Sequence, residues 1–273
     1  MPIITIFGST FGDDEAVAKS VADAMGYAYV SRELFIAASQ RYGIPEAKLN
    51  DIVEKEPHWW QRWVENLRPY RVALQAAMCE VAERGNVVYY GHIGHGLLPG
   101  IRHVLKVLLL APMQFRIEQV RARQGFDAAR ARRHIDHVDK AHSRRLMALF
   151  GTDWREPGQY ALILNMAQMS PAAACRLIVE GAKLEQYQPT AASEQDLRDL
   201  SLGARVQAAL ALSPALRGLM INVEAKGGVV TLSGFLRAPA TEQEIRGLVE
   251  SVPGVSEIRT DFVTVPSRAL RAQ

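Results

Sequence analysis

Four short apolar runs alternate with longer segments of helical periodicity through the first two thirds of this 273-residue chain. The runs are residues 3–7, 87–90, 104–110 and 160–165. A short run that is apolar at nearly every position is typical of a strand buried on both faces of a sheet. Parallel strands of this kind need helical crossovers, which cover both faces of the sheet. The pattern therefore predicts an α/β fold in three layers, α/β/α, with a parallel sheet in the middle.

The pattern changes after residue 185. Residues 186–195 are polar, contain a proline and show no periodicity, which is typical of an interdomain linker. Residues 196–265 then show the order helix, strand, strand, helix, strand, with a Lys-Gly-Gly turn between the first two strands. This order predicts a small α+β (αββαβ) domain with an antiparallel sheet. We therefore expect a first domain at residues 1–185, a linker, and a second domain at residues 196–265.

The composition argues against several classes of protein. The formal net charge is only +3, which is too small to indicate a nucleic-acid partner or an anionic membrane surface. No apolar run reaches the ~20 residues of a membrane helix, so we expect no transmembrane segment. Cys79 and Cys175 lie far apart without metal-ligand spacing, as expected for reduced thiols in a cytoplasmic protein. No Cys or carboxylate completes a zinc motif around either pair of closely spaced histidines, so we expect no metal site.

A glycine loop follows the first apolar run and leads into a helix. The unpaired N–H groups at the start of such a helix form a natural site for an anion. The candidate nucleotide-binding residues of this loop are Gly8, Ser9, Thr10 and Gly12. However, Asp13, Asp14 and Glu15 stand where a phosphate-binding loop usually offers Gly, Lys and a hydroxyl group.

Two interpretations of these acids stay open. Carboxylates in a first helical turn stabilise the helix by ~0.3–1 kcal/mol, and a carboxylate on the free N–H groups occupies the place of a phosphate. In the second interpretation, Asp13 or Asp14 holds Mg²⁺, which bridges to a phosphate.

Residues 3–180 resemble the cytidylate-kinase-like proteins, a branch of the P-loop nucleoside monophosphate kinases. The likeness is carried by the segments AMGYAYVSRELF, VVYYGHIGHG, VLKVLLLAPMQFRI, VDKAHSRR and FGTDW…P…YALILN. The resemblance implies a three-layer α/β/α fold. It also implies transfer of phosphate from ATP, with Mg²⁺, to CMP or a similar nucleoside monophosphate.

The resemblance also implies roles for individual residues. The Arg-rich stretch at residues 119–145 lies in the region that corresponds to a lid closing over ATP. The implied catalytic residues are Arg116, Arg133 and Arg144, the implied nucleotide-binding residues of the lid are Arg121 and Arg123, and the implied acceptor-binding residues are Arg32 and His92. The family has Arg at the position of His92 and frequently at that of His142, and it usually has Asp at Ser31. The alternative for the lid is a solvated helix face with salt bridges to Asp127, Asp136 and Asp139.

Residues 196–265 resemble a BON domain. The likeness is carried by VQAALALSPAL, INVEAKGGVVTLSGFL and VESVPGVSEIRT. BON domains are associated with attachment to membranes or ligands and are usually binding modules. Acidic residues slightly outnumber basic ones here, so no polybasic patch favours an anionic lipid. A hydrophobic ligand or a protein is the expected partner.

Three functional hypotheses remain. The first is a nucleotide- or anion-binding regulatory module with a weakened phosphate loop, a pseudokinase. The second is an active kinase that uses Arg side chains and Mg²⁺ in place of the missing Lys. The third is a non-nucleotide scaffold in which the first domain only forms a homo-oligomer, a dimer, and the BON-like unit binds a partner. Trp59, Trp60 and Trp63 fit either stacking on a nucleotide base or packing of a helical flap or oligomer interface.

Overall fold

The computed structural model describes residues 2–9, 14–54, 67–216, 218–236 and 240–264, with only the backbone described at residues 51–54, 240 and 264. The elements of the first domain are β1 (Ile3–Gly8), α1 (Asp14–Met25), β2 (Ala28–Val30), α2 (Glu33–Tyr42), α3 (Glu46–Glu54), α5 (Arg68–Glu83), β3 (Val87–Tyr90), α6 (Gly94–Leu97), β4 (Val104–Leu110), α7 (Met113–Gln124), α8 (Ala128–Phe150), η2 (Pro157–Gln159), β5 (Leu162–Asn165), α9 (Pro171–Lys183) and η3 (Glu185–Tyr187). The four predicted strands are present, and β2 is a short fifth strand.

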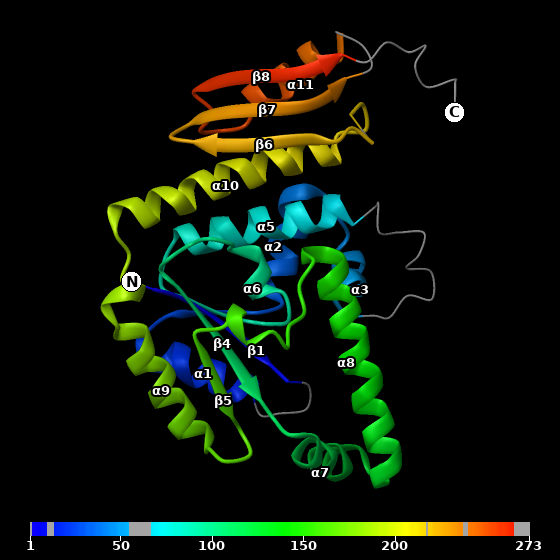
Figure 1. Ribbon diagram of the computed structural model, residues 1–273, viewed down its shortest axis with the longest axis vertical. Coiled ribbons are helices and arrows are strands. Elements are labelled where there is room, and N and C mark those ends of the chain that lie inside the picture. Colours follow the sequence, from blue (N-terminus) through cyan, green and yellow to red (C-terminus); the bar gives the residue numbers. More distant parts are fainter. Residues whose placement is uncertain (1, 10–13, 55–66, 217, 237–239, 265–273) are drawn as a thin grey trace.

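The strands of the first domain form one parallel sheet in the order β2-β3-β1-β4-β5. Side chains alternate across the central strand: Ile3 and Phe7 join one core with α2, α5, α6 and α8, whereas Ile4 and Ile6 join a second core with α1 and α9. Figure 1 shows these helices on the two sides of the sheet. The predicted three-layer α/β/α fold is therefore confirmed, with the sheet covered on both faces.

The second domain consists of α10 (Ala191–Leu212), β6 (Ile221–Lys226), β7 (Val229–Leu236), α11 (Ala240–Glu250) and β8 (Glu257–Thr264). The predicted αββαβ order is confirmed, and β6 and β7 form the predicted antiparallel hairpin. The prediction of a fully antiparallel sheet was wrong, because β8 runs parallel to β7. The helix α11 carries the chain back along the sheet, so the next strand starts at the same end as β7.

The helix α10 begins at Ala191, where the side chain of Thr190 and that of Ser193 form a reciprocal capping box. Residues 191–195, which the sequence assigned to a linker, are therefore helical. Pro189 precedes this cap. The exact boundaries of the two domains stay a prediction.

The two domains pack together through α5 and α10, which lie side by side in Figure 1. Val72 and Ala76 of α5 form a buried cluster with Ala204 and Ala208 of α10. Small side chains at these positions allow the two helices to approach closely. None of the helices within the described residues is long and apolar enough to cross a membrane.

Candidate functional site

The carboxyl ends of the central strands bring the predicted site segments together. The strand β1 ends at Gly8, β3 ends at Tyr90 before the GHIGHG segment, and β4 ends at Leu110 before α7. Ligands of open parallel sheets bind outside this edge, because the loops that follow neighbouring strands meet there. The first domain therefore presents its glycine loop, its histidines and its lid at one edge.

A buried carboxylate lies against the start of the glycine loop. Asp14 is the first residue of α1 and is only 1% exposed. A Cβ atom placed on Gly8 would lie 2.4 Å from Asp14 Oδ2, so the carboxylate packs directly against the Gly8 main chain. The position at which a phosphate-binding loop carries its Lys is therefore held by a buried acid. Thr10, Gly12 and Asp13 lie outside the described residues.

The neighbouring acid, Glu15, faces the surface of α1. Its carboxylate pairs with Lys19 (2.8 Å) and accepts a hydrogen bond from the Tyr29 hydroxyl (3.2 Å). The hydrogen bond from Lys19 lowers the pKa of Glu15 below its usual value, against a smaller opposing effect of burial. Glu15 occupies the position at which a phosphate loop carries the hydroxyl group that binds Mg²⁺. Its described contacts are instead with Lys19 and Tyr29.

The hydroxyl group of Ser9 is already engaged. Ser9 is buried, its Oγ accepts a hydrogen bond from the backbone N–H of Ala111 (2.8 Å), and its own N–H donates to the carbonyl oxygen of Leu109 (2.9 Å). These bonds tie the end of β1 to the end of β4. Ser9 therefore fixes the edge of the sheet, and its predicted contact with a nucleotide stays a prediction.

Aromatic and histidine rings gather beside the loop. The rings of His92 and His142 lie 4.0 Å apart between centroids, and Phe7 meets His92 edge-on at 5.2 Å. Burial, and then the charge of Arg145, lower the pKa of His92 to about 4. Burial, and then His92, lower that of His142 to about 2. Both imidazoles are therefore neutral at pH 7, in positions where the resemblance implied guanidinium groups.

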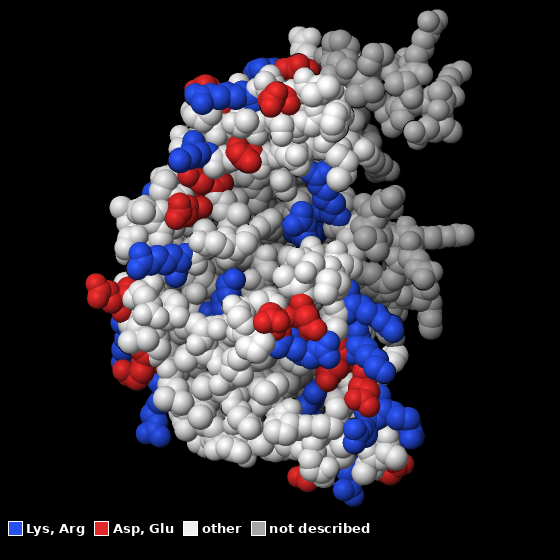
Figure 2. Space-filling view, viewed as in Figure 1, with Lys and Arg blue, Asp and Glu red and all other residues white. Residues whose placement is uncertain are grey.

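The arginines of the lid differ in burial and in their contacts. Arg116 of α7 is 4% exposed and forms a bidentate pair with Asp139 of α8, through Nη1 (2.8 Å) and Nη2 (2.6 Å). The remaining lid candidates are exposed: Arg121, Arg123, Arg133 and Arg144. Figure 2 shows acidic and basic side chains mixed over this part of the surface. The alternative of a solvated, ion-paired helix therefore describes much of the lid, with Arg132 and Asp136 as a further loose pair (4.0 Å).

Asp127 caps α8. Its Oδ1 accepts a hydrogen bond from the backbone N–H of Arg130 (2.8 Å).

Sequence reasoning missed Arg145, which is 3% exposed and lowers the pKa of both His92 and His142. The helical phase of α8 was the available signal, because residues 142, 145, 146 and 149 share its buried face.

Arg32, the predicted acceptor-binding residue, lies at the surface. Its Nε pairs with Glu46 Oε1 of α3 (2.8 Å). The residue at the N-cap position of α2 is Arg32, which makes no side-chain capping bond, and the N–H of the preceding Ser31 donates to Glu33. Among the contacts described for Arg32, none is with His92. The Trp59–Trp63 cluster lies outside the described residues.

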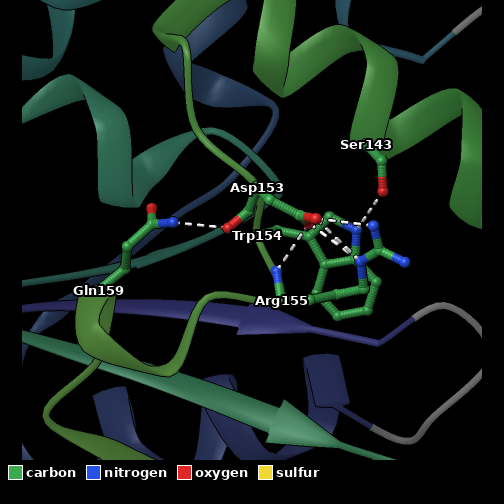
Figure 3. Close-up of polar contacts among 5 residues, drawn as sticks. All are labelled: Ser143, Asp153, Trp154, Arg155 and Gln159. Atoms are coloured by element: carbon green, nitrogen blue, oxygen red, sulfur yellow. Dashed lines mark hydrogen bonds and ion pairs between the residues drawn. The ribbon is translucent and has the colours of Figure 1, made fainter.

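The FGTDW segment follows the end of α8, and Figure 3 shows the polar contacts that its residues make. Trp154 stacks on Phe7 with centroids 5.2 Å apart, and its Nε1 donates to Ser143 Oγ (3.0 Å). Asp153 pairs with Arg155 (2.6 Å) and accepts a bond from Gln159 through its carbonyl oxygen. This segment therefore holds the lid helix against β1.

Residues 3–168, more than half of the chain, match the Cytidylate kinase-like family. The chain belongs to that family. Residues 198–266 match the BON domain, so both predicted resemblances are confirmed.

Known relatives of the cytidylate kinase-like domain cover about two thirds of the chain. The chain is 28% identical over 179 residues to a cytidylate kinase from Ignicoccus hospitalis, spanning 65% of this chain and 97% of that protein. It is 25% identical over 177 residues to a cytidylate kinase from Methanopyrus kandleri, spanning 62% of this chain and 86% of that protein. A solved structure of an uncharacterized protein from Eubacterium ventriosum aligns with a TM-score of 0.52 and 16% identity, covering 66% of this chain and 97% of that one, and shows the fold alone.

The described part of the glycine loop differs from a typical phosphate-binding loop in the groups it offers. A triphosphate needs cationic and hydroxyl groups, whereas the described loop offers the buried Asp14 and the engaged hydroxyl of Ser9. Among the residues that the structure describes, no group of three or more His, Cys, Asp or Glu side chains is placed to hold a metal ion.

Proposed function

We propose that the cytidylate kinase-like domain is a nucleotide- or anion-binding regulatory module with a weakened phosphate loop, fused to a BON domain that binds a ligand. The observation that carries this proposal is the buried Asp14 carboxylate against the Gly8 main chain. A phosphate at this loop meets a like charge in a setting where Coulomb repulsion is several-fold stronger than in water. Phosphoryl transfer depends on neutralising the charge of the phosphates, which an acid at this position opposes.

The neutral histidines support the same proposal. His92 and His142 supply ring faces but no positive charge at pH 7, which leaves the lid as the source of cations. The exposed guanidinium groups of Arg121, Arg123 and Arg133 are suited to contacts with phosphate oxygens. Such a domain senses a nucleotide through its lid without transferring phosphate.

The decisive experiment is calorimetric titration of ATP into the full chain and into Asp14→Asn, which removes the charge and keeps the shape. We expect ATP to bind Asp14→Asn at least about tenfold more tightly than the wild type. The matched control is Asp23→Asn, an exposed acid on the same helix, which should leave the affinity unchanged. Equal affinities for the wild type and Asp14→Asn would end the proposal.

An active ATP-dependent nucleoside monophosphate kinase, with CMP or a similar acceptor and Mg²⁺, is the second candidate. It is favoured by the cytidylate kinase relatives and by the retained lid residues Arg116, Arg133 and Arg144. A coupled assay for ADP with a panel of monophosphates tests it. Turnover of CMP that Arg144→Ala abolishes would establish the kinase and exclude the regulatory module.

A further inference from the structure

A pocket of about 360 Å³ lies where the two domains meet. Arg68 and Arg71 of α5 form its basic wall, and Gln207 of α10 and Asn222 of β6 add two amide groups from the second domain. None of the described residues that line this pocket is acidic. Figure 2 shows basic side chains gathered in a hollow between the two domains. We call this the interdomain pocket.

The two guanidinium groups of the pocket are held differently. Arg68 donates through Nη1 to the carbonyl oxygen of Leu219 (3.5 Å) and through Nη2 to that of Ile221, so it is fixed to the start of β6. Arg71 makes no hydrogen bond or ion pair within the part of the chain that the structure describes. It is half-buried, and no carboxylate among the described residues balances its charge.

The electrostatics of the pair favour an anion. Burial lowers the pKa of Arg71, and burial followed by the charge of Arg71 lowers that of Arg68. Two like charges held together away from water are unfavourable unless an opposite charge joins them. A dianion would balance the pair fully, whereas a single carboxylate would balance half of it. Phosphate monoesters are dianions near neutral pH and match the planar fork of Arg.

A second pocket of about 580 Å³, lined mostly by apolar residues but also by Lys48, adjoins the interdomain pocket. Arg68 and Met220 line both. The walls of the second pocket include Ile44, Leu212 and Leu216. A ligand with its charge between the arginines therefore has apolar space beside it, which is the usual composition of a small-molecule site.

We propose that the interdomain pocket binds a phosphate monoester with an apolar body, with the phosphate between Arg68 and Arg71 and the body in the adjoining pocket. The amides of Gln207 and Asn222 donate to the remaining phosphate oxygens. This site goes beyond the proposed function, because its described lining includes neither Asp14 nor His92. Since both domains contribute to it, the ligand also holds them together.

Calorimetric titration of the full chain with hexyl phosphate, inorganic phosphate and hexanoate tests the site. We expect hexyl phosphate to bind at least about tenfold more tightly than either of the others, because only it has both a dianion and an apolar body. Arg71→Gln should weaken it at least about tenfold, and Asn222→Ala about threefold. The matched control is Arg84→Gln, an exposed arginine just beyond the other end of α5, which should leave binding unchanged.

Three results would overturn the assignment. The first is the absence of heat on titration with hexyl phosphate, and the second is wild-type affinity for it in Arg71→Gln. The third is that CMP, which has a polar body, binds more tightly than hexyl phosphate and that Arg71→Gln abolishes this binding. Thermal unfolding without ligand provides the folding control. Arg71→Gln should melt at or above the wild-type temperature, because it removes a charge that no described carboxylate balances. A lower melting temperature would contradict this premise.

Discussion

At the scale of single residues, His95 shows how the fold uses a histidine as an aromatic ring. Its side chain is buried at 5% exposure, and neither ring nitrogen has a hydrogen-bond partner among the described residues. The ring lies among Phe7, Phe150 and Tyr160, with centroids 5.6, 6.5 and 5.8 Å away. Burial, and then the charge of Lys106, lower the pKa of His95 to about 4. An imidazole in this setting is stable only when it is neutral.

This depressed pKa fixes the direction of a pH effect. As the pH falls, His95 is protonated in the unfolded chain before it is protonated in the folded chain. The contribution of neutral His95 to the free energy of unfolding should therefore be complete above pH ~6.5 and should decline toward pH ~4. His95→Phe removes the titration and the unpaired nitrogens, and we expect it to raise the free energy of unfolding at pH 7 by about 1 kcal/mol and to reduce the pH dependence. His95→Gln, which is polar but does not titrate, should reduce the pH dependence alone. Urea unfolding across this range measures both, and a wild-type slope in His95→Phe would contradict the account.

At the scale of elements, α7 and α8 form a hairpin whose inner contacts are not visible in the sequence. Ile117 and Val120 pack on Ala131 and Ile135. Arg116 lies on the same side of α7 and pairs with Asp139, 23 residues further along the chain. An Arg in an amphipathic helix gives the same sequence pattern whether it faces a substrate or a distant carboxylate, so the catalytic role that the resemblance implied for Arg116 stays a prediction.

Breaking this pair separates the two roles of Arg116. Arg116→Gln removes the bidentate partner of Asp139, and we expect this substitution to lower the free energy of unfolding by about 3 kcal/mol. Arg121→Gln, an exposed change on the same helix, should stay within about 0.5 kcal/mol of the wild type. Thermal unfolding gives the comparison. Unchanged stability in Arg116→Gln together with lost ATP binding would instead assign Arg116 to the ligand.

The elements differ in how far the sequence determines them. The run at Ile3–Gly8 is apolar because both faces of β1 are covered, so the sequence identified a buried parallel strand correctly. The direction of β8 depends on how α11 crosses the sheet, which no local pattern records. The buried setting of Asp14 follows from its contact with Gly8, and the sequence indicated only that an acid was present.

At the scale of the whole molecule, α10 belongs to both domains. Ala204 and Ala208 pack against α5, whereas Leu202 and Val206 lie in the core of the second domain. Leu197, near its start, joins the core of the first domain. Apolar residues on two faces obscure the usual one-sided pattern of a surface helix, which is why the sequence assigned α10 to the second domain alone. A shared helix predicts that the two domains unfold as one cooperative unit.

A charge in this helical contact should divide the unit. Ala208→Glu places a carboxylate, without a partner among the described residues, against Val72 and Ala76, which are fully buried. Since a buried unpaired charge costs several kcal/mol, we expect the single calorimetric transition to separate into two, with α5 losing its partner first. Ala192→Glu, at an exposed position on the same helix, should keep one transition near the wild-type temperature. If the wild type already shows two transitions, α10 does not couple the domains. If Ala208→Glu keeps a single transition, the α5–α10 contact is not what joins the domains.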